Sequence, residues 1–274
     1  MNKIYVWVNN ALIPEDEATV NIKDLSVQRG YGIFDFFKVV NQEPVFLDDH
    51  LDRFYHSAEL MRLSVKQPRE HIRQMIMDLI QKNGFSDSGI RMTLTGGYSP
   101  DGYNIAEPNL LITQQSFQLT KELQTEGISI ITQSYQRQFS EAKTLDYLKA
   151  IWLQPVLKEQ GVDDVLYVHD GCLRECPRAN FFIVSAEGTV LTQKSEMLKG
   201  VTRKHILRIS EKMYPTEERD VSLEELRNAK EAFITSTTKN VMPVVKIDGN
   251  VLGDGKPGEI TQSLAAAYNR MIYS

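Results

Sequence analysis

Short apolar runs bounded by turn residues recur along the chain, and they constrain its fold more than any other feature. Residues 33–40 are almost continuously apolar, which predicts a strand. Two segments with apolar residues at helical spacing follow it, at 51–61 and, after Pro68, at 72–80. Because such strands outnumber what a helical bundle needs, we predict a fold of mixed α and β class.

A polar stretch at 117–127 is the best candidate for a connection between two domains. We therefore expect a small α/β domain over 1–116, an interdomain linker over 117–127 and a larger domain over 128–274. Within the larger domain, the pattern predicts a helix from Leu145 to Glu159, a hairpin within 181–192 and a closing helix over 260–271.

Composition excludes several classes of function. The 274 residues are 42% hydrophobic and 24% charged, which is ordinary for a globular protein with a sizeable core. A formal net charge of -5 and a pI near 5.6 leave no broad basic face, so nucleic acid is not expected as a partner. No stretch approaches the roughly 18 apolar residues that a membrane span needs, and no export signal precedes the first strand, so no membrane association is expected.

Cysteine and histidine usage indicates the compartment and argues against a metal site. The two cysteines, Cys172 and Cys176, are too few for a disulfide framework, and a reducing cytoplasm is the expected location. The five histidines show no spacing typical of metal ligands, so we expect no metal.

Several features are suited to binding a phosphate group. Gly200 directly precedes a predicted helix start at Val201 or Thr202, where free N–H groups and the helix dipole favour an anion. A hydroxyl cluster at 236–238 follows a strand, and Arg53 lies in the first helix. Each also has a purely structural interpretation: a loop hinge, a turn cap or a solvated arginine.

Two charged residues, Glu175 and Lys143, are candidates for catalysis only when the segments around them are considered. Glu175 lies between two strands and could pair with a protonated ring nitrogen, although a surface carboxylate is the simpler interpretation. Lys143 lies after a strand and before a predicted helix, where most lysines are solvated. Spacing alone does not select either residue as catalytic.

The order in which these segments occur carries more information than any one of them. The ordered segments are Arg29–Asp35, His50–Phe54, Lys143–Leu148, Glu175–Asn180, Leu198–Arg203 and Thr235–Thr238. Together they resemble the fold-type IV pyridoxal-phosphate enzymes, the class-IV aminotransferase group of branched-chain and D-amino-acid aminotransferases and aminodeoxychorismate lyase. The resemblance covers almost the whole chain and implies a two-domain α/β fold with the cofactor between the domains.

The resemblance also implies roles for particular residues. Lys143 would be the catalytic lysine, joined to pyridoxal 5′-phosphate as an imine (Schiff base). The other implied cofactor contacts are Arg53, Tyr147, Glu175, Asn180, Leu198, Gly200, Val201, Thr202, Thr237 and Thr238. The implied substrate contacts are Arg29, Phe34, Asp35 and Arg91. Members of this group pair two chains, so a homodimer is expected.

Three functions remain open at this level. The first is transfer of an amino group from an amino acid to a 2-oxo acid, and the second is the lyase reaction that releases pyruvate and 4-aminobenzoate. Asp35 stands where the lyase has a small hydroxylated residue, and this difference neither proves nor excludes the lyase reaction. A non-catalytic binding protein is the third. Asp101 and Tyr103 stand where the D-amino-acid enzymes have an arginine and a histidine, which argues against that specificity. Arg91 has two equal interpretations, a contact to the substrate carboxylate or part of the polar face of a strand.

Overall fold

The computed structural model describes residues 3–116 and 118–273, and the chain forms two compact units. The first unit is Met1–Leu119 with Ala142–Asp146, and the second is Thr120–Glu141 with Tyr147–Ser274. The first crossing between units falls within the linker expected at 117–127, of which Phe117 lies outside the described residues. The return of Ala142–Asp146 to the first unit differs from the continuous second domain that the sequence suggested.

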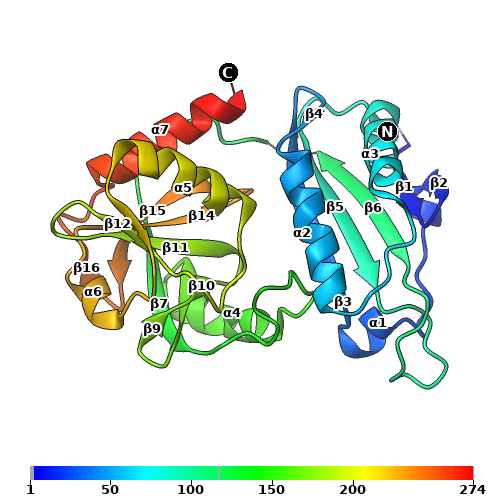
Figure 1. Cartoon of the computed structure of the whole chain (residues 1–274), viewed down its shortest axis with the longest axis horizontal. Coiled ribbons are helices and arrows are strands. Elements are labelled where there is room, and N and C mark those ends of the chain that lie inside the picture. The colour runs from blue at the N-terminus through cyan, green and yellow to red at the C-terminus, as the bar shows by residue number, and fades with distance from the viewer. Residues whose placement is uncertain (1–2, 117, 274) are drawn as a thin grey trace. The chain divides into compact units, whose positions relative to one another are not determined.

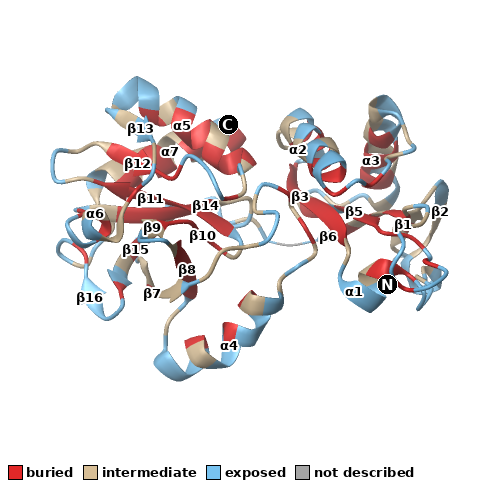
Figure 2. Cartoon of the chain, turned by 60° about the horizontal axis from the view of Figure 1, so that its bottom comes forward, coloured by how far each residue is buried: buried red, intermediate tan, exposed pale blue. Residues whose placement is uncertain are grey.

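The first unit contains a six-stranded antiparallel sheet of order β2-β1-β6-β5-β3-β4. Its strands are β1 (Tyr5–Val8), β2 (Ala11–Pro14), β3 (Gly32–Val40), β4 (Glu43–Pro44), β5 (Ser88–Thr95) and β6 (Leu110–Ser116). Its helices are a 3-10 turn (Glu15–Glu17), α1 (Leu25–Arg29), α2 (Leu47–Leu60) and α3 (Arg69–Asn83). Helices α2 and α3 lie over the same face of the sheet (Figures 1 and 2).

The core of the first unit lies between this sheet and its two helices. Leu51 and Phe54 of α2 and Ile76 of α3 are fully buried, and they pack with Ile33 and Phe37 of β3. Because side chains alternate along a strand, the even-numbered residues of β3 project from the opposite face.

The segment around Lys143 extends the sheet beyond the edge of β3. The Phe34 amide donates to the Lys143 carbonyl at 2.9 Å, and the Leu145 amide donates to the Gly32 carbonyl at 3.0 Å. Thr144 lies opposite Ile33 in an antiparallel bridge. The helix predicted to begin at Leu145 therefore begins at Leu148, because the backbone at 143–145 is extended to pair with β3.

The second unit contains a ten-stranded mixed sheet, with the main order β13-β12-β11-β14-β15-β7-β8-β9, β10 beside β11 and β16 beside β15. Its strands are β7 (Ile128–Ser134), β8 (Asp164–His169), β9 (Cys172–Leu173), β10 (Glu175–Cys176), β11 (Ala179–Val184), β12 (Val190–Thr192), β13 (Thr216–Glu218), β14 (Glu231–Ser236), β15 (Asn240–Ile247) and β16 (Asn250–Val251). Its helices are α4 (Leu148–Gln160), α5 (Val201–Met213), α6 (Leu223–Arg227) and α7 (Glu259–Tyr273).

Helices α5 and α7 lie side by side over the sheet of the second unit, whose central strands are buried (Figures 1 and 2). Helix α4 packs on β8 through Leu153 and Leu157, which contact Val165 and Tyr167. Within the described residues, no helix combines the length and apolar character needed to cross a membrane.

Candidate active site

Lys143 is fixed through its backbone and lies on the face of the first unit's sheet that is turned away from α2. Its amide donates to the Ser57 hydroxyl of α2 at 3.1 Å, and its carbonyl accepts from Phe34. Residues opposite each other in an antiparallel pair share a face, so the Lys143 side chain lies on the same side as Phe34. The Lys143 Nζ atom is 4.7 Å from the centroid of the Phe34 ring.

Arg91 of β5 contacts the same ring. Its guanidinium carbon lies 4.4 Å from the Phe34 centroid, so the Arg91 and Lys143 charges are within about 9 Å of each other. The Arg91 side chain is exposed and has no carboxylate partner among the described residues. An anion that reaches this face therefore meets an available guanidinium beside an amine.

A buried carboxylate on the other face of β3 holds Arg53. Asp35 has no exposed surface; it accepts from Arg53 Nε and Nη2, each at 2.8 Å, and its Oδ1 lies 2.7 Å from His50 Nδ1. This fork fixes the guanidinium and leaves its Nη1 hydrogens available to another acceptor. Asp35 belongs to the face that packs on α2, so this placement favours a supporting role over direct contact with a substrate.

The charges in this cluster are compensated internally. Burial by itself would raise the pKa of Asp35, but the Arg53 guanidinium and the hydrogen bond with His50 hold that pKa well below its usual range. Burial lowers the pKa of His50, so its imidazole is neutral at pH 7 and donates through Nδ1 to the carboxylate. One negative and one positive charge remain, which makes the buried cluster neutral overall.

In the second unit, Glu175 is held by a second arginine. Arg137 Nε donates to Glu175 Oε1 at 2.8 Å, and the Leu198 amide donates to Oε2 at 3.1 Å. The side chains of Arg137 and Glu175 are 13% and 7% exposed, so solvent screens this pair only weakly. The charge of Glu175 and the hydrogen bond to it raise the pKa of Arg137 against the effect of burial, and Tyr147 also contributes.

The loop before α5 closes tightly on Asn180. The Asn180 amide donates to the Leu198 carbonyl at 2.6 Å, and a Cβ atom at Gly200 would lie 2.1 Å from Asn180 Oδ1. A side chain at position 200 would therefore force the Asn180 side chain to shift from its bond with Leu198. Gly200 is the N-cap of α5, and this helix has neither a side-chain cap nor an acidic residue in its first turn.

These residues of the second unit fit a phosphate group. The first N–H groups of α5 lack intrahelical acceptors, as at every helix start, and Val201 and Thr202 supply two of them. Thr235 Oγ1 is buried without a hydrogen-bond partner among the described residues, and Thr235 is the strand partner of Asn180. Thr237 and Thr238 lie in the turn between β14 and β15.

The structure also positions the remaining predicted residues. Tyr147 is the N-cap of α4 and lies close enough to affect Arg137 electrostatically. Arg29 ends α1 and is exposed, and its Nη1 donates to the Gln28 carbonyl. Among the described residues, no group of three or more histidine, cysteine or acidic side chains could hold a metal ion.

Sequence reasoning missed two residues that support the predicted ones. Arg137 gave no signal, because it lies in a polar stretch between β7 and α4 without recognisable spacing. His50 was noted only as part of the segment that contains Arg53, yet the two are three residues apart on a helix and so share a face. That spacing was the available clue.

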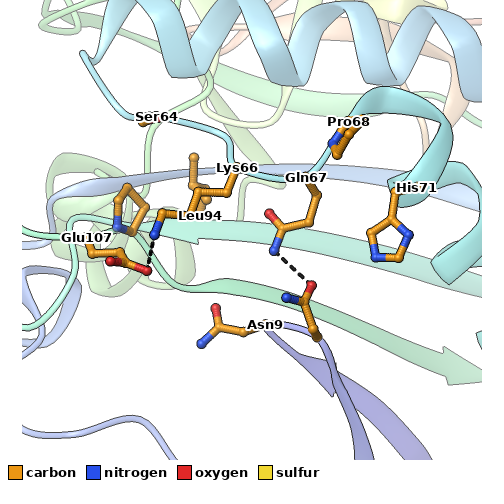
Figure 3. A pocket seen from close by; sticks show the side chains of 10 residues that line it. Asn9, Ser64, Lys66, Gln67, Pro68, His71, Leu94 and Glu107 are labelled. Atoms are coloured by element: carbon orange, nitrogen blue, oxygen red, sulfur yellow. Dashed lines mark hydrogen bonds and ion pairs between the residues drawn. The ribbon is translucent and has the colours of Figure 1, made fainter.

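A polar pocket of the first unit lies apart from these residues. It is lined by Asn9, Lys66, Gln67, His71 and Glu107 among others (Figure 3). Lys66 and Glu107 form an ion pair at its surface, and Gln67 donates to Asn10 at 3.2 Å. None of the predicted site residues lines it.

The buried Asp35 cluster makes a prediction about stability. Asp35→Asn should lower the free energy of unfolding by about 3–5 kcal/mol at pH 7, because it leaves the Arg53 charge buried without its counter-ion. Since the folded pKa of Asp35 is depressed, its contribution is complete above the unfolded pKa of about 4 and declines as pH falls towards the folded value.

Urea unfolding of both proteins between pH 7 and pH 3 tests this. The difference between wild type and variant should narrow below about pH 4. Asp170→Asn is the control, because the Asp170 side chain is 84% exposed, and it should change stability by under about 0.5 kcal/mol. A difference that is absent at pH 7, or independent of pH, would contradict the assigned pairing.

The chain is similar to known proteins along almost its whole length. The chain is 29% identical to the D-alanine aminotransferase of Bacillus licheniformis, over 98% of this chain and 97% of that protein. The crystal structure of the branched-chain aminotransferase of Thermoproteus uzoniensis with norvaline superposes with a TM-score of 0.88 at 27% identity, covering 98% of this chain and 95% of that one.

A third similarity concerns the fold alone. The branched-chain amino acid aminotransferase of Escherichia coli superposes with a TM-score of 0.90 at 23% identity, covering 100% of this chain and 95% of that one.

The family described as amino-transferase class IV matches residues 32–247, which include β3, Lys143 and the α5 loop. The chain thus belongs to the class IV amino-transferase family and is an aminotransferase.

Proposed function

We propose that this protein is a pyridoxal 5′-phosphate-dependent aminotransferase that moves the amino group of an amino acid to a 2-oxo acid. The observation that carries the proposal is the placement of the Lys143 amine against Phe34 on the sheet face opposite α2, within about 9 Å of Arg91. Because the matched relatives are aminotransferases, we propose amino transfer rather than the lyase reaction.

Residues of both units would share the chemical roles of this reaction. Bound pyridoxal phosphate would supply an electron sink for the substrate's α carbon. Lys143 would hold the cofactor covalently through Nζ and, once released, move a proton as base and then acid. Glu175 would pair with the protonated ring nitrogen, while the hydrogen bond from Arg137 Nε holds that carboxylate in place. Tyr147 would donate to the phenolic oxygen.

The phosphate would be held by fixed donors. Arg53 offers the Nη1 hydrogens that Asp35 leaves available, and the Val201 and Thr202 amides offer the helix N-terminus. The Thr237 and Thr238 hydroxyls complete the set. Asn180 and Leu198 act by shaping the loop, since the Asn180 amide bonds the Leu198 carbonyl.

Substitution of Lys143 tests the covalent role. Lys143→Ala should abolish borohydride-dependent attachment of the cofactor, which mass spectrometry reads as the loss of the added mass on the peptide containing residue 143. Lys38→Ala is the control, because burial lowers the pKa of Lys38 to about 8 and so favours a neutral, nucleophilic amine on β3 as well. Attachment that survives Lys143→Ala, or that disappears in Lys38→Ala, would refute the role of Lys143.

We propose that Arg91 binds the substrate carboxylate on the sheet face that carries Phe34, with Phe34, Arg29 and Asp35 as further residues of the substrate site. A guanidinium with no counter-ion among the described residues favours an anionic group in front of β5. Asp35 would act indirectly through Arg53, because its carboxylate is enclosed.

Kinetics of an Arg91 variant test this assignment. L- and D-amino acid donors are first screened with pyruvate and 2-oxoglutarate as acceptors, and the best pair is used for the variants. Arg91→Gln should raise KM about tenfold or more with a smaller change in kcat, because a charge-assisted bond is made in both ground and transition states. Arg91→Lys should recover part of the loss. Unchanged KM in Arg91→Gln would show that Arg91 belongs only to a polar strand face.

We further propose that two copies of the chain form a homodimer through α4. Leu148, Ile151 and Trp152 are 79%, 67% and 63% exposed, and they lie at helical spacing opposite the buried Leu153 and Leu157. Figure 2 shows that α4 carries both exposed and buried residues. An apolar stripe of this kind is typical of an interaction surface. A reducing, cytoplasmic location is proposed as well, supported by the free thiols of Cys172 and Cys176.

Light scattering after size exclusion tests the dimer. The double substitution Ile151→Glu with Trp152→Glu should shift the protein from dimer to monomer at micromolar concentration, because two charges would be buried in an apolar contact. Gln160→Glu, at the end of the same helix, should remain dimeric. A dimer that withstands the double substitution would exclude α4 from the interface, and a monomeric wild type would refute the dimer itself.

A further inference from the structure

The C-terminal helix α7 contributes one polar group to the N-terminus of α5. Leu264, Ala265, Tyr268 and Ile272 are spaced one to four residues apart along one side of the helix and are buried, so this face of α7 packs inward. Helices α5 and α7 lie side by side in Figure 1. The Tyr268 hydroxyl reaches across the contact between them. It donates to Thr202 Oγ1 at 3.2 Å.

Both partners of this hydrogen bond are enclosed. Tyr268 is 2% exposed and Thr202 is 4% exposed, so water does not compete for the bond. Burial raises the pKa of Tyr268, and the phenol therefore stays protonated and remains a donor across the physiological pH range.

The direction of the bond determines what Thr202 can do. A hydroxyl that accepts one hydrogen bond still carries its own hydrogen. Thr202 has no other side-chain hydrogen bond among the described residues, so this hydrogen remains available. Thr202 is the second residue of α5, next to the first N–H groups of a helix whose N-cap, Gly200, has no side-chain capping bond.

A second observation points to a ligand at this place. Thr235 Oγ1 is buried without a partner among the described residues, although Thr235 is only 2% exposed. Thr235 lies opposite Asn180, and Asn180 bonds the Leu198 carbonyl in the loop that leads into α5. A buried hydroxyl without a partner is costly, and a polar ligand would relieve that cost.

We propose that Tyr268 is a positioning residue: by donating to Thr202 Oγ1, it directs the Thr202 hydroxyl hydrogen to a phosphate dianion at the N-terminus of α5. This inference rests on the proposed function, in which the phosphate of pyridoxal 5′-phosphate binds there. The C-terminal helix thus contributes to cofactor affinity without contacting the cofactor.

Two aldehydes that differ only in the phosphate test the role of Tyr268. The full-length chain, freed of cofactor, is titrated with pyridoxal 5′-phosphate and with pyridoxal, and binding is followed by absorbance. Tyr268→Phe should weaken binding of the phosphorylated aldehyde about five- to tenfold, the value of one weakened hydrogen bond to a charged group. Binding of pyridoxal should be unchanged, because it has no phosphate.

Matched variants separate positioning from general stability. Tyr273→Phe removes another hydroxyl from α7, one that accepts a hydrogen bond from Asn240. This variant should leave the affinities for pyridoxal 5′-phosphate and for pyridoxal unchanged. Thr202→Val should reproduce the selective loss, and adding Tyr268→Phe to it should cause no further loss. Melting temperatures of all variants show whether each is folded.

The outcomes distinguish the inference from the function on which it rests. Equal weakening of both aldehydes by Tyr268→Phe, no weakening of either, or additive loss in the double variant would refute the positioning role. A wild-type chain that binds neither aldehyde would instead refute the proposed function.

Discussion

Backbone pairing between 143–145 and β3 is the constraint on which the first unit's site depends. An exposed strand edge offers unpaired N–H and C=O groups, and this segment satisfies those beside Gly32 and Phe34. The pairing also fixes the face on which the amine lies. A shift of register by one residue would turn Lys143 towards α2 and Thr144 outward, because side chains alternate along an extended backbone. The Ser57 hydroxyl of α2, which accepts from the Lys143 amide, adds a second restraint.

Both units enclose a carboxylate in an arginine fork or ion pair. Asp35 with Arg53 and Glu175 with Arg137 follow the same logic, since a buried charge is tolerated only when it is paired and hydrogen-bonded. Each pair limits the motion of both side chains. In the first pair, the Nη1 hydrogens of Arg53 remain available to a ligand. At these positions, burial therefore fixes the geometry of each ion pair in addition to strengthening the attraction between its charges.

Much of the fold could be predicted from the sequence, because strands and helices obey local periodicities. The strand at 33–40, the two helices after it and the closing helix appear near their predicted bounds. The start of α4 could not be predicted, because the preceding residues pair with a strand more than a hundred positions away. Arg137 was missed for the same reason: its partner Glu175 is distant in sequence and near only in the folded unit.

By itself, the sequence determined the chemistry that is available. The family resemblance could be identified from Lys143, Arg53, Gly200 and the ordered segments around them. Residue types and their order are properties of the chain itself. Tertiary structure alone decided how those groups are used. It turned Lys143 away from α2 to lie beside Phe34 and Arg91, enclosed Asp35 on the face that packs on α2, and brought Tyr268 to Thr202. Strand register and helix packing set these placements, and both depend on contacts between residues far apart in sequence.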